Sequence, residues 1–171
     1  MREIDAGRLV LRAIDPEVAS ALLEGRRPEG VAFARGYPSQ FSLEVMDLVA
    51  GARAGQASGF GPFFMVRKAD ATVVGEIGAH LDTTSATAQV GYSVVEPCWG
   101  HGYATEALRA LLAVVLADPG VRRVVGETLV EHAASRRVME KAGMRHHGQR
   151  TGEVDGQTVE LVAYEALADQ R

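Results

Sequence analysis

The chain has 171 residues, of which 47% are hydrophobic and 23% are charged, and its net charge at pH 7 is −4. This length and composition predict a single globular domain over residues 1–171 and exclude a largely disordered chain. The acidic balance argues against a nucleic-acid partner, and the absence of a long apolar run argues against a membrane span or signal peptide, so we expect a cytoplasmic protein with neither partner.

The N-terminal segment predicts a strand followed by a helix. Residues 8–14 alternate between apolar and polar side chains and are rich in strand-forming residues. Residues 15–25 predict a helix in which Asp15 is the N-cap, Pro16 occupies the first turn and Gly25 ends the helix.

The middle of the chain predicts a second helix and a meander. Residues 26–40 contain several prolines and glycines and predict an irregular connection. Residues 42–55 follow as a helix that Ser42 opens. Short polar turns then separate three segments with strand composition, which predicts antiparallel pairing of residues 63–69, 72–82 and 86–95.

The pattern changes in the last third of the chain. Apolar residues recur at helical spacing, at positions 104, 107, 108, 111, 112 and 115. A strand over residues 121–130 and a helix over residues 133–143 follow, and two strands flank the hairpin signal Asp155-Gly156, over residues 144–150 and 157–167. The order of these elements predicts an α+β domain with a mixed sheet.

The loop before the third helix has the composition of a phosphate site. Gly100 and Gly102 permit backbone angles that other residues avoid, and the helix begins directly after them. The free N–H groups of a helix start favour an anion, and Thr105 adds a hydroxyl. A Gly-x-Gly before a helix also occurs in ordinary tight turns, so this signal alone leaves a structural role open. The triphosphate loop motif is absent, and the meander is the wrong setting for a dinucleotide fingerprint.

Residues 99–104, WGHGYA, resemble the coenzyme A loop of the GNAT acetyltransferase superfamily, Gln/Arg-x-x-Gly-x-Gly/Ala. Trp99 stands at the Gln/Arg position, Gly102 is the required glycine and Ala104 is the small residue. The continuation is similar to the branch that includes ribosomal-protein-alanine N-acetyltransferases. A second family block, in which an Asn-x-x-Ser pattern precedes Glu-Lys-x-Gly-Phe, is matched at Ser135, Val138, Glu140, Lys141 and Gly143.

The resemblance implies an α+β fold with a mixed, mostly antiparallel sheet of about seven strands, splayed between the fourth and fifth and flanked by about four helices. It implies transfer of an acetyl group from acetyl-CoA, without a metal, to a primary amine of a small molecule or a protein N-terminus, by direct attack in a ternary complex. Residues 121–150 carry a charge of +4 and the remainder −8, which favours a cationic amine. Homodimers are common in the family, and the two C-terminal strands are the expected edge.

The resemblance also assigns coenzyme contacts. The pyrophosphate is expected on the backbone of the loop and helix start, Trp99, Gly100, His101, Gly102, Tyr103, Ala104 and Thr105. The pantetheine arm is expected along the backbone of Tyr92 and Val94, with an N–H near Val94 facing the thioester oxygen. Its other side meets His132, which replaces the family's asparagine, and Ser135. The basic side chains near the 3′-phosphate would be Arg136, Arg137 and Lys141.

For the catalytic base, the resemblance favours Glu127, which matches the position of a glutamate in some N-terminal acetyltransferases. The alternative is a strand carboxylate paired with an arginine. Glu76 and His80 are weaker candidates. Met139 occupies the position of the family's usual tyrosine acid, which excludes that donor. The departures at Met139 and His132 keep open a second function, a non-catalytic sensor or assembly module that binds coenzyme A.

Overall fold

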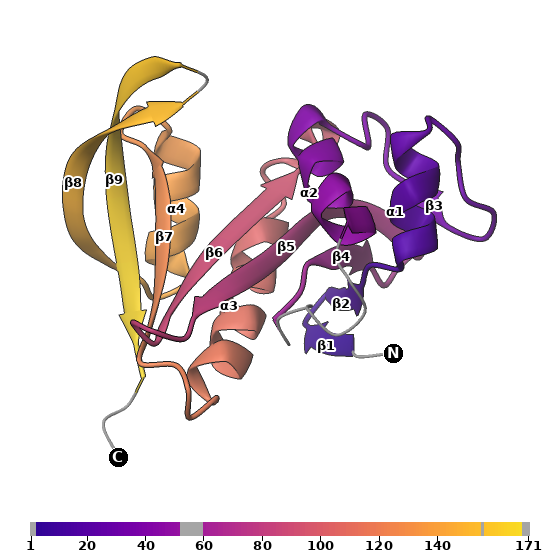
Figure 1. The fold of residues 1–171 in the computed structure, drawn as a ribbon. Coiled ribbons are helices and arrows are strands. Elements are labelled where there is room, and N and C mark those ends of the chain that lie inside the picture. The colour runs from indigo at the N-terminus through magenta and orange to yellow at the C-terminus, as the bar shows by residue number, and fades with distance from the viewer. Residues whose placement is uncertain (1–2, 52–59, 155, 169–171) are drawn as a thin grey trace.

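The computed structural model describes residues 3–51, 60–154 and 156–168. They form one sheet, in which the strand order is β1-β2-β4-β5-β6-β7-β9-β8 and β3 pairs with β5 (Figure 1). The strands are β1 (Glu3–Ala6), β2 (Leu9–Ala13), β3 (Ala32–Phe33), β4 (Phe63–Arg67), β5 (Thr72–Asp82), β6 (Thr87–Val94), β7 (Arg123–Leu129), β8 (Arg145–Val154) and β9 (Gln157–Leu167).

Four α-helices cover this sheet, namely α1 (Pro16–Leu23), α2 (Gln40–Gly51), α3 (Tyr103–Leu116) and α4 (Ala133–Lys141), and a short 3₁₀ turn, η1 (Glu96–Cys98), precedes α3. The α2 helix packs over the face of β5 that carries Glu76, and Ser42 of α2 donates a hydrogen bond to that carboxyl. The α4 helix packs against the other face, where a side chain at Gly126 would collide with Met139. Within the described residues, no helix has the length and hydropathy of a membrane span.

The helix starts show one prediction confirmed and one wrong. Asp15 caps α1, and its Oδ1 accepts the N–H of Glu17 at 2.8 Å. Ser42 does not open the second helix, since α2 begins at Gln40 and the hydrogen bonds of Ser39 make that residue its cap. Ser39 Oγ accepts the N–H of Ser42, and Ser42 Oγ accepts the N–H of Ser39, each at 3.1 Å. This reciprocal pair is a capping box built from two serines, and it buries Ser42 inside the protein.

The sheet opens between β6 and β7. The meander β4–β5–β6 is antiparallel throughout, as predicted. By contrast, the parallel pairing of β6 with β7 covers only residues 87–89 of β6 and 123–125 of β7. Beyond it the two strands diverge, which Figure 1 shows as a widening gap between β6 and the β7–β9–β8 unit. The predicted splay is therefore present.

The predicted fold class is correct, with two strands more than the expected seven. The added strands are β1, which pairs with β2 through a tight turn, and the two-residue β3. The expected hairpin lies between β8 and β9; Gly156 in its turn has a φ of 75°, and Asp155 lies outside the described residues.

Candidate active site

The loop before α3 presents a row of free backbone donors. Gly102 is the N-cap of α3 with a φ of 81°, and Gly100 has a φ of 76°. The first helical bond runs from the N–H of Glu106 to the carbonyl of Gly102 at 3.1 Å. In the part of the chain that the structure describes, the N–H groups of residues 100–105 have no hydrogen-bond partner. Free donors at a helix start favour a bound anion, and the phosphate site predicted for this loop stays a prediction.

Arg8, in the turn just before β2, holds this loop in place. Its Nη2 donates to the carbonyl oxygen of His101 at 2.5 Å, and its guanidinium pairs with Glu106 at 2.7 Å. The same group lies over the ring of Tyr103, 5.1 Å from the ring centre. Sequence reasoning missed Arg8, since no local pattern links it to a loop more than 90 positions later.

Trp99 connects the loop to the end of β6. Its indole Nε1 donates to the carbonyl oxygen of Val94 at 2.5 Å, although 62% of the residue is exposed. His101 Nδ1 lies 2.8 Å from the carbonyl oxygen of Trp99, and its ring stacks on Tyr103. The loop and the strand edge are thus joined into one surface.

On the edge of β6 that faces the splay, the N–H groups of Tyr92 and Val94 have no hydrogen-bond partner among the described residues. The N–H of Val95 donates to the carbonyl of Val74 on β5 at 3.0 Å. Since antiparallel pairing alternates, the N–H groups of Val94 and Tyr92 point away from β5, toward the gap. This edge can therefore accept an extended polar chain as an additional strand.

Two of the predicted contacts meet across the gap. The Tyr92 hydroxyl lies 2.9 Å from Ser135 Oγ on α4 and donates to the Ser135 carbonyl oxygen at 3.1 Å. His132 is the N-cap residue of α4, but its side chain makes no hydrogen bond to the helix backbone. Its Nδ1 lies 3.2 Å from Thr128 Oγ1. Met139 is buried in the hydrophobic core.

Of the three basic residues expected near the 3′-phosphate, Arg136 has other partners. It donates to the carbonyl oxygen of Val130 at 3.1 Å and to the Tyr164 hydroxyl at 3.4 Å. Arg137 and Lys141 are exposed on α4.

Glu127 forms an ion pair. Arg150 on β8 donates to both of its carboxyl oxygens, from Nε at 2.8 Å and from Nη2 at 2.7 Å. This two-point contact lowers the pKa of Glu127 below its usual value. A carboxylate that is so paired is a poor proton acceptor, and the geometry matches the alternative of a strand carboxylate held by an arginine. The catalytic role of Glu127 stays a prediction.

Glu76 has the opposite environment. It is 1% exposed, beneath α2, and burial raises its pKa to about 7, while the nearby hydroxyls of Tyr37, Ser42 and Ser93 oppose that shift. Ser42 Oγ donates to Glu76 Oε1 at 3.1 Å. Within the described residues, Glu76 Oε2 and the Tyr37 hydroxyl lie buried without a hydrogen bond of good geometry.

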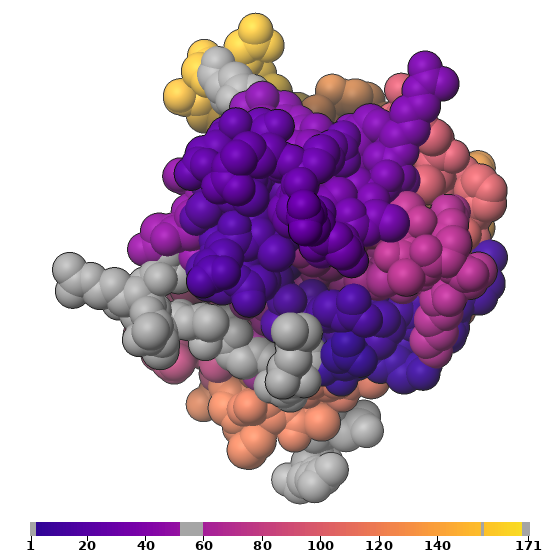
Figure 2. Space-filling view, turned by 90° about the vertical axis from the view of Figure 1, so that its right-hand side faces the viewer, coloured from indigo at the N-terminus to yellow at the C-terminus, as the bar shows by residue number. Residues whose placement is uncertain are grey.

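Glu76 also lies close to the splay. It pairs in register with Ser93, the residue between Tyr92 and Val94. The N-terminal third of the chain forms much of the surface on the α1 and α2 side of the molecule, which Figure 2 shows in indigo and purple. The raised pKa could not be read from the sequence, because it depends on the packing of α2. His80, the other weak candidate, is exposed further along β5.

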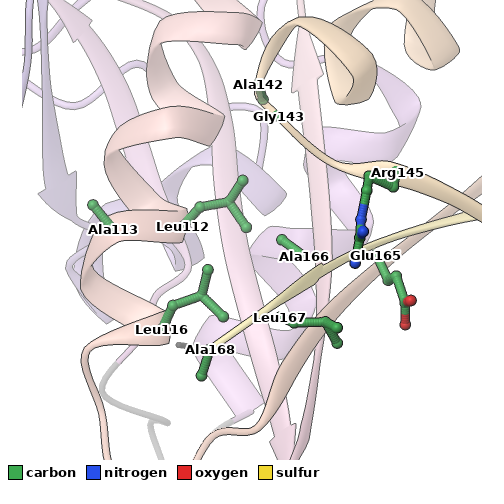
Figure 3. Close-up of a pocket in the computed structure, with 10 residues that line it drawn as sticks. All are labelled: Leu112, Ala113, Leu116, Ala142, Gly143, Arg145, Glu165, Ala166, Leu167 and Ala168. Atoms are coloured by element: carbon green, nitrogen blue, oxygen red, sulfur yellow. The ribbon is translucent and has the colours of Figure 1, made fainter. Parts of the chain in front are cut away.

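A groove of about 460 Å³ lies elsewhere, between the C-terminal half of α3, the turn after α4 and the end of β9 (Figure 3). Leu112, Leu116 and Leu167 line it, together with Arg145 and Glu165. It is at the other end of α3 from the glycine loop and is not part of the site. Among the described residues, no three His, Cys, Asp or Glu side chains gather as a metal site would require.

Comparison with known proteins identifies the family and the fold. A family model described as "Acetyltransferase (GNAT) domain" matches residues 8–145. A curated Bacillus subtilis protein, the uncharacterized N-acetyltransferase YoaA, is 23% identical over 148 residues, or 85% of this chain and 84% of that one. An Aspergillus fumigatus protein, FsC-acetyl coenzyme A-N(2)-transacetylase, is 36% identical over 58 residues, and this match spans 34% of the chain and only 25% of the relative.

Among solved structures, that of RimL, a ribosomal L7/L12 alpha-N-protein acetyltransferase in complex with coenzyme A, superposes with a TM-score of 0.76. The two chains are 19% identical, with 98% of this chain and 99% of that chain covered. At this identity the likeness establishes the fold, and the substrate of that protein is not transferred here.

Proposed function

The chain belongs to the GNAT acetyltransferase family and is an acetyl-CoA-dependent N-acetyltransferase, and from this premise we propose that a primary amine attacks acetyl-CoA directly while Glu76 accepts the amine's proton. The observation that carries the proposal is the pairing of an open β6 edge with a buried carboxyl of near-neutral pKa on the adjacent strand.

The chain's free donors fit the coenzyme. We assign the pyrophosphate to the N–H groups of residues 100–105 and the pantetheine arm to the β6 edge at Tyr92 and Val94, with Ser135 opposite. His132 remains a predicted contact beside them. Acetyl-CoA supplies an activated acetyl group. The N–H of Val94, which faces the gap, is placed to stabilise negative charge on the carbonyl oxygen as the amine attacks.

Glu76 suits the removal of a proton from an ammonium group. A base works best when its pKa lies near the working pH, and burial brings the pKa of Glu76 to about 7. Its partner in register, Ser93, is half-buried and lies between the carboxyl and the splay. We propose that the proton passes through the Ser93 hydroxyl or a water beside it, because Glu76 itself has almost no exposed surface.

For the acceptor, α2 offers an exposed aromatic side chain. Phe41 at the start of α2 is 42% exposed, and its ring lies 4.0 Å from where a side chain at Gly91 would begin. Phe33 and Tyr37, which lie in the connection before α2, pack with the core instead, and their stacked rings have centres 5.2 Å apart. We propose a cationic primary amine, on a small molecule or at a protein N-terminus, that enters between Phe41 and β6.

The test is release of free thiol from acetyl-CoA in the presence of an amine panel. The panel contains peptides that begin with Ala, Ser or Met, polyamines, aminoglycosides and free amino acids. Turnover with one class identifies the acceptor, and mass spectrometry of the product locates the acetyl group. Tight coenzyme binding without turnover on any amine would contradict the proposal and favour the sensor function.

A further inference from the structure

We propose that the hydroxyl of Tyr92 protonates the departing thiolate and that Ser135 positions this hydroxyl. The inference rests on the proposed acetyl transfer and concerns the proton that the sulfur must gain, for which the family's usual tyrosine position offers only Met139.

The first observation is the contact itself. Tyr92 lies three residues beyond the last β6 residue that pairs with β7, where the gap has opened. Its side chain reaches α4, where the hydroxyl is 2.9 Å from Ser135 Oγ and donates to the Ser135 carbonyl oxygen at 3.1 Å. A phenol carried by β6 therefore reaches across to α4, beside the strand edge that we assign to the pantetheine arm.

The second observation is the division of the site by β6. Ser93 pairs in register with Glu76, whereas Tyr92 pairs with Ile77. Since successive side chains of a strand point to opposite faces, Ser93 and Glu76 lie on the α2 face and Tyr92 lies on the α4 face. The amine thus loses its proton on one side of the strand, and the sulfur can gain one on the other.

The third observation concerns the other polar groups near the start of α4. The imidazole of His132 lies next to Thr128, 3.2 Å from its Oγ1. Met139, one turn after Ser135, is buried and carries no proton to give. Burial raises the pKa of Tyr92 above its usual value, so its hydroxyl is protonated at neutral pH before each turnover.

The step balances as follows. The amine nitrogen forms a bond to the acetyl carbon, the C–S bond breaks, and its electron pair moves to sulfur. The O–H of Tyr92 turns from the Ser135 carbonyl oxygen to that sulfur and transfers its proton there, and the tyrosinate then recovers a proton from water, with the Ser135 hydroxyl donating a hydrogen bond meanwhile. The proton lost by the amine resides on Glu76 and returns to solvent.

The test compares Tyr92→Phe with Tyr164→Phe. The control also removes a largely buried phenol that contacts α4, because the Tyr164 hydroxyl donates to Glu140 Oε1 at 2.7 Å. We expect Tyr92→Phe to lower kcat by about 100-fold at pH 7, with the Kd of coenzyme A unchanged. The deficit should shrink above pH about 9, since a thiol of pKa about 8.5 then leaves without protonation. Tyr164→Phe should show no loss of kcat that depends on pH.

Ser135 has its own test because it acts through Tyr92. Ser135→Ala should lower kcat with the same dependence on pH, and Ser135→Thr, which keeps the hydroxyl, should restore most of the loss. If Ser135→Ala lowers kcat equally at every pH, the positioning role is wrong.

A second readout needs no acceptor. The thiolate of bound coenzyme A absorbs in the ultraviolet, so its thiol can be titrated in wild type and in Tyr92→Phe. A hydroxyl that donates to the sulfur stabilises the thiolate, and the wild-type complex should therefore titrate at the lower pH. Equal titration in the two proteins would overturn the proposal. Absence of turnover by wild type on any amine would instead contradict the proposed function and leave this titration to decide the role of Tyr92.

Discussion

The guanidinium of Arg8 and the carbonyl oxygen of His101 lie 2.5 Å apart, although 93 positions separate the two residues in the sequence. Arg8 thereby fixes the middle of the loop whose N–H groups form the anion site. We expect Arg8→Ala to raise the KM for acetyl-CoA by about 10-fold with a small change in kcat, because a loss of about 1.4 kcal/mol in binding is tenfold. Arg12→Ala, which removes a surface pair with Glu3, is the matched control and should leave that KM unchanged.

Gly102→Glu tests the loop itself. The residue has a φ of 81°, and its N–H belongs to the free row, so a carboxylate there adds both strain and charge at the expected pyrophosphate site. Calorimetry should detect no binding of coenzyme A. Gly30→Glu is the control, since Gly30 has a φ of 75° and open space around it. If Gly102→Glu binds coenzyme A with normal affinity, the assignment of the coenzyme to this loop is wrong.

Glu76→Gln should abolish most of the activity. The amide cannot accept a proton, so we expect kcat to fall by about 100-fold or more. In the wild type, kcat/KM should rise with pH through about 7, where the carboxyl ionises, and this limb should be absent from the residual activity of the variant. A wild-type profile that is flat between pH 6 and pH 8 would contradict the assignment.

The Glu76 carboxyl should also make the free energy of unfolding depend on pH. This free energy should fall as the pH rises, whereas kcat/KM should increase. The folded state raises the pKa of Glu76 from 4.5 to about 7, so it binds this proton more tightly than the unfolded chain. The contribution of Glu76 to the free energy of unfolding is greatest below pH 4.5 and is lost as the pH rises through about 7. At 1.36 kcal/mol per pH unit, the loss is about 3 kcal/mol. Urea unfolding at both pH values should show this loss in wild type and not in Glu76→Gln.

Glu127→Gln separates the two candidate bases. If the ion pair with Arg150 is structural, the variant should keep kcat within about threefold and lose no more than about 1 kcal/mol of unfolding free energy, as partly exposed pairs do. Arg150→Gln, which removes the other partner, should behave alike. A fall in kcat for Glu127→Gln as large as that for Glu76→Gln would return the role of base to Glu127.

Sequence patterns predicted the parts of the site that are local. The glycine loop, the helix after it and the antiparallel meander each depend on neighbouring residues, and all three are present. Two features depend on distant contacts and were not predictable. Arg8 reaches the loop only because β2 lies beside α3 in the folded chain, and Glu76 acquires its raised pKa only because α2 covers it. The resemblance favoured Glu127 over Glu76 as the base, and the pairing of Glu127 with Arg150 depends on how β8 folds beside it.

The serine pair at the start of α2 has a consequence for the acceptor side. The Ser42 hydroxyl accepts the N–H of Ser39 and donates to Glu76, so a single oxygen serves both the helix start and the carboxyl. Phe41, which we assign to the acceptor wall, is the residue before it. Each time Glu76 gains or loses a proton, the hydrogen bond that ends at this oxygen changes strength. The position of Phe41 is thus linked, through the hydrogen bonds of Ser42, to the protonation state of Glu76.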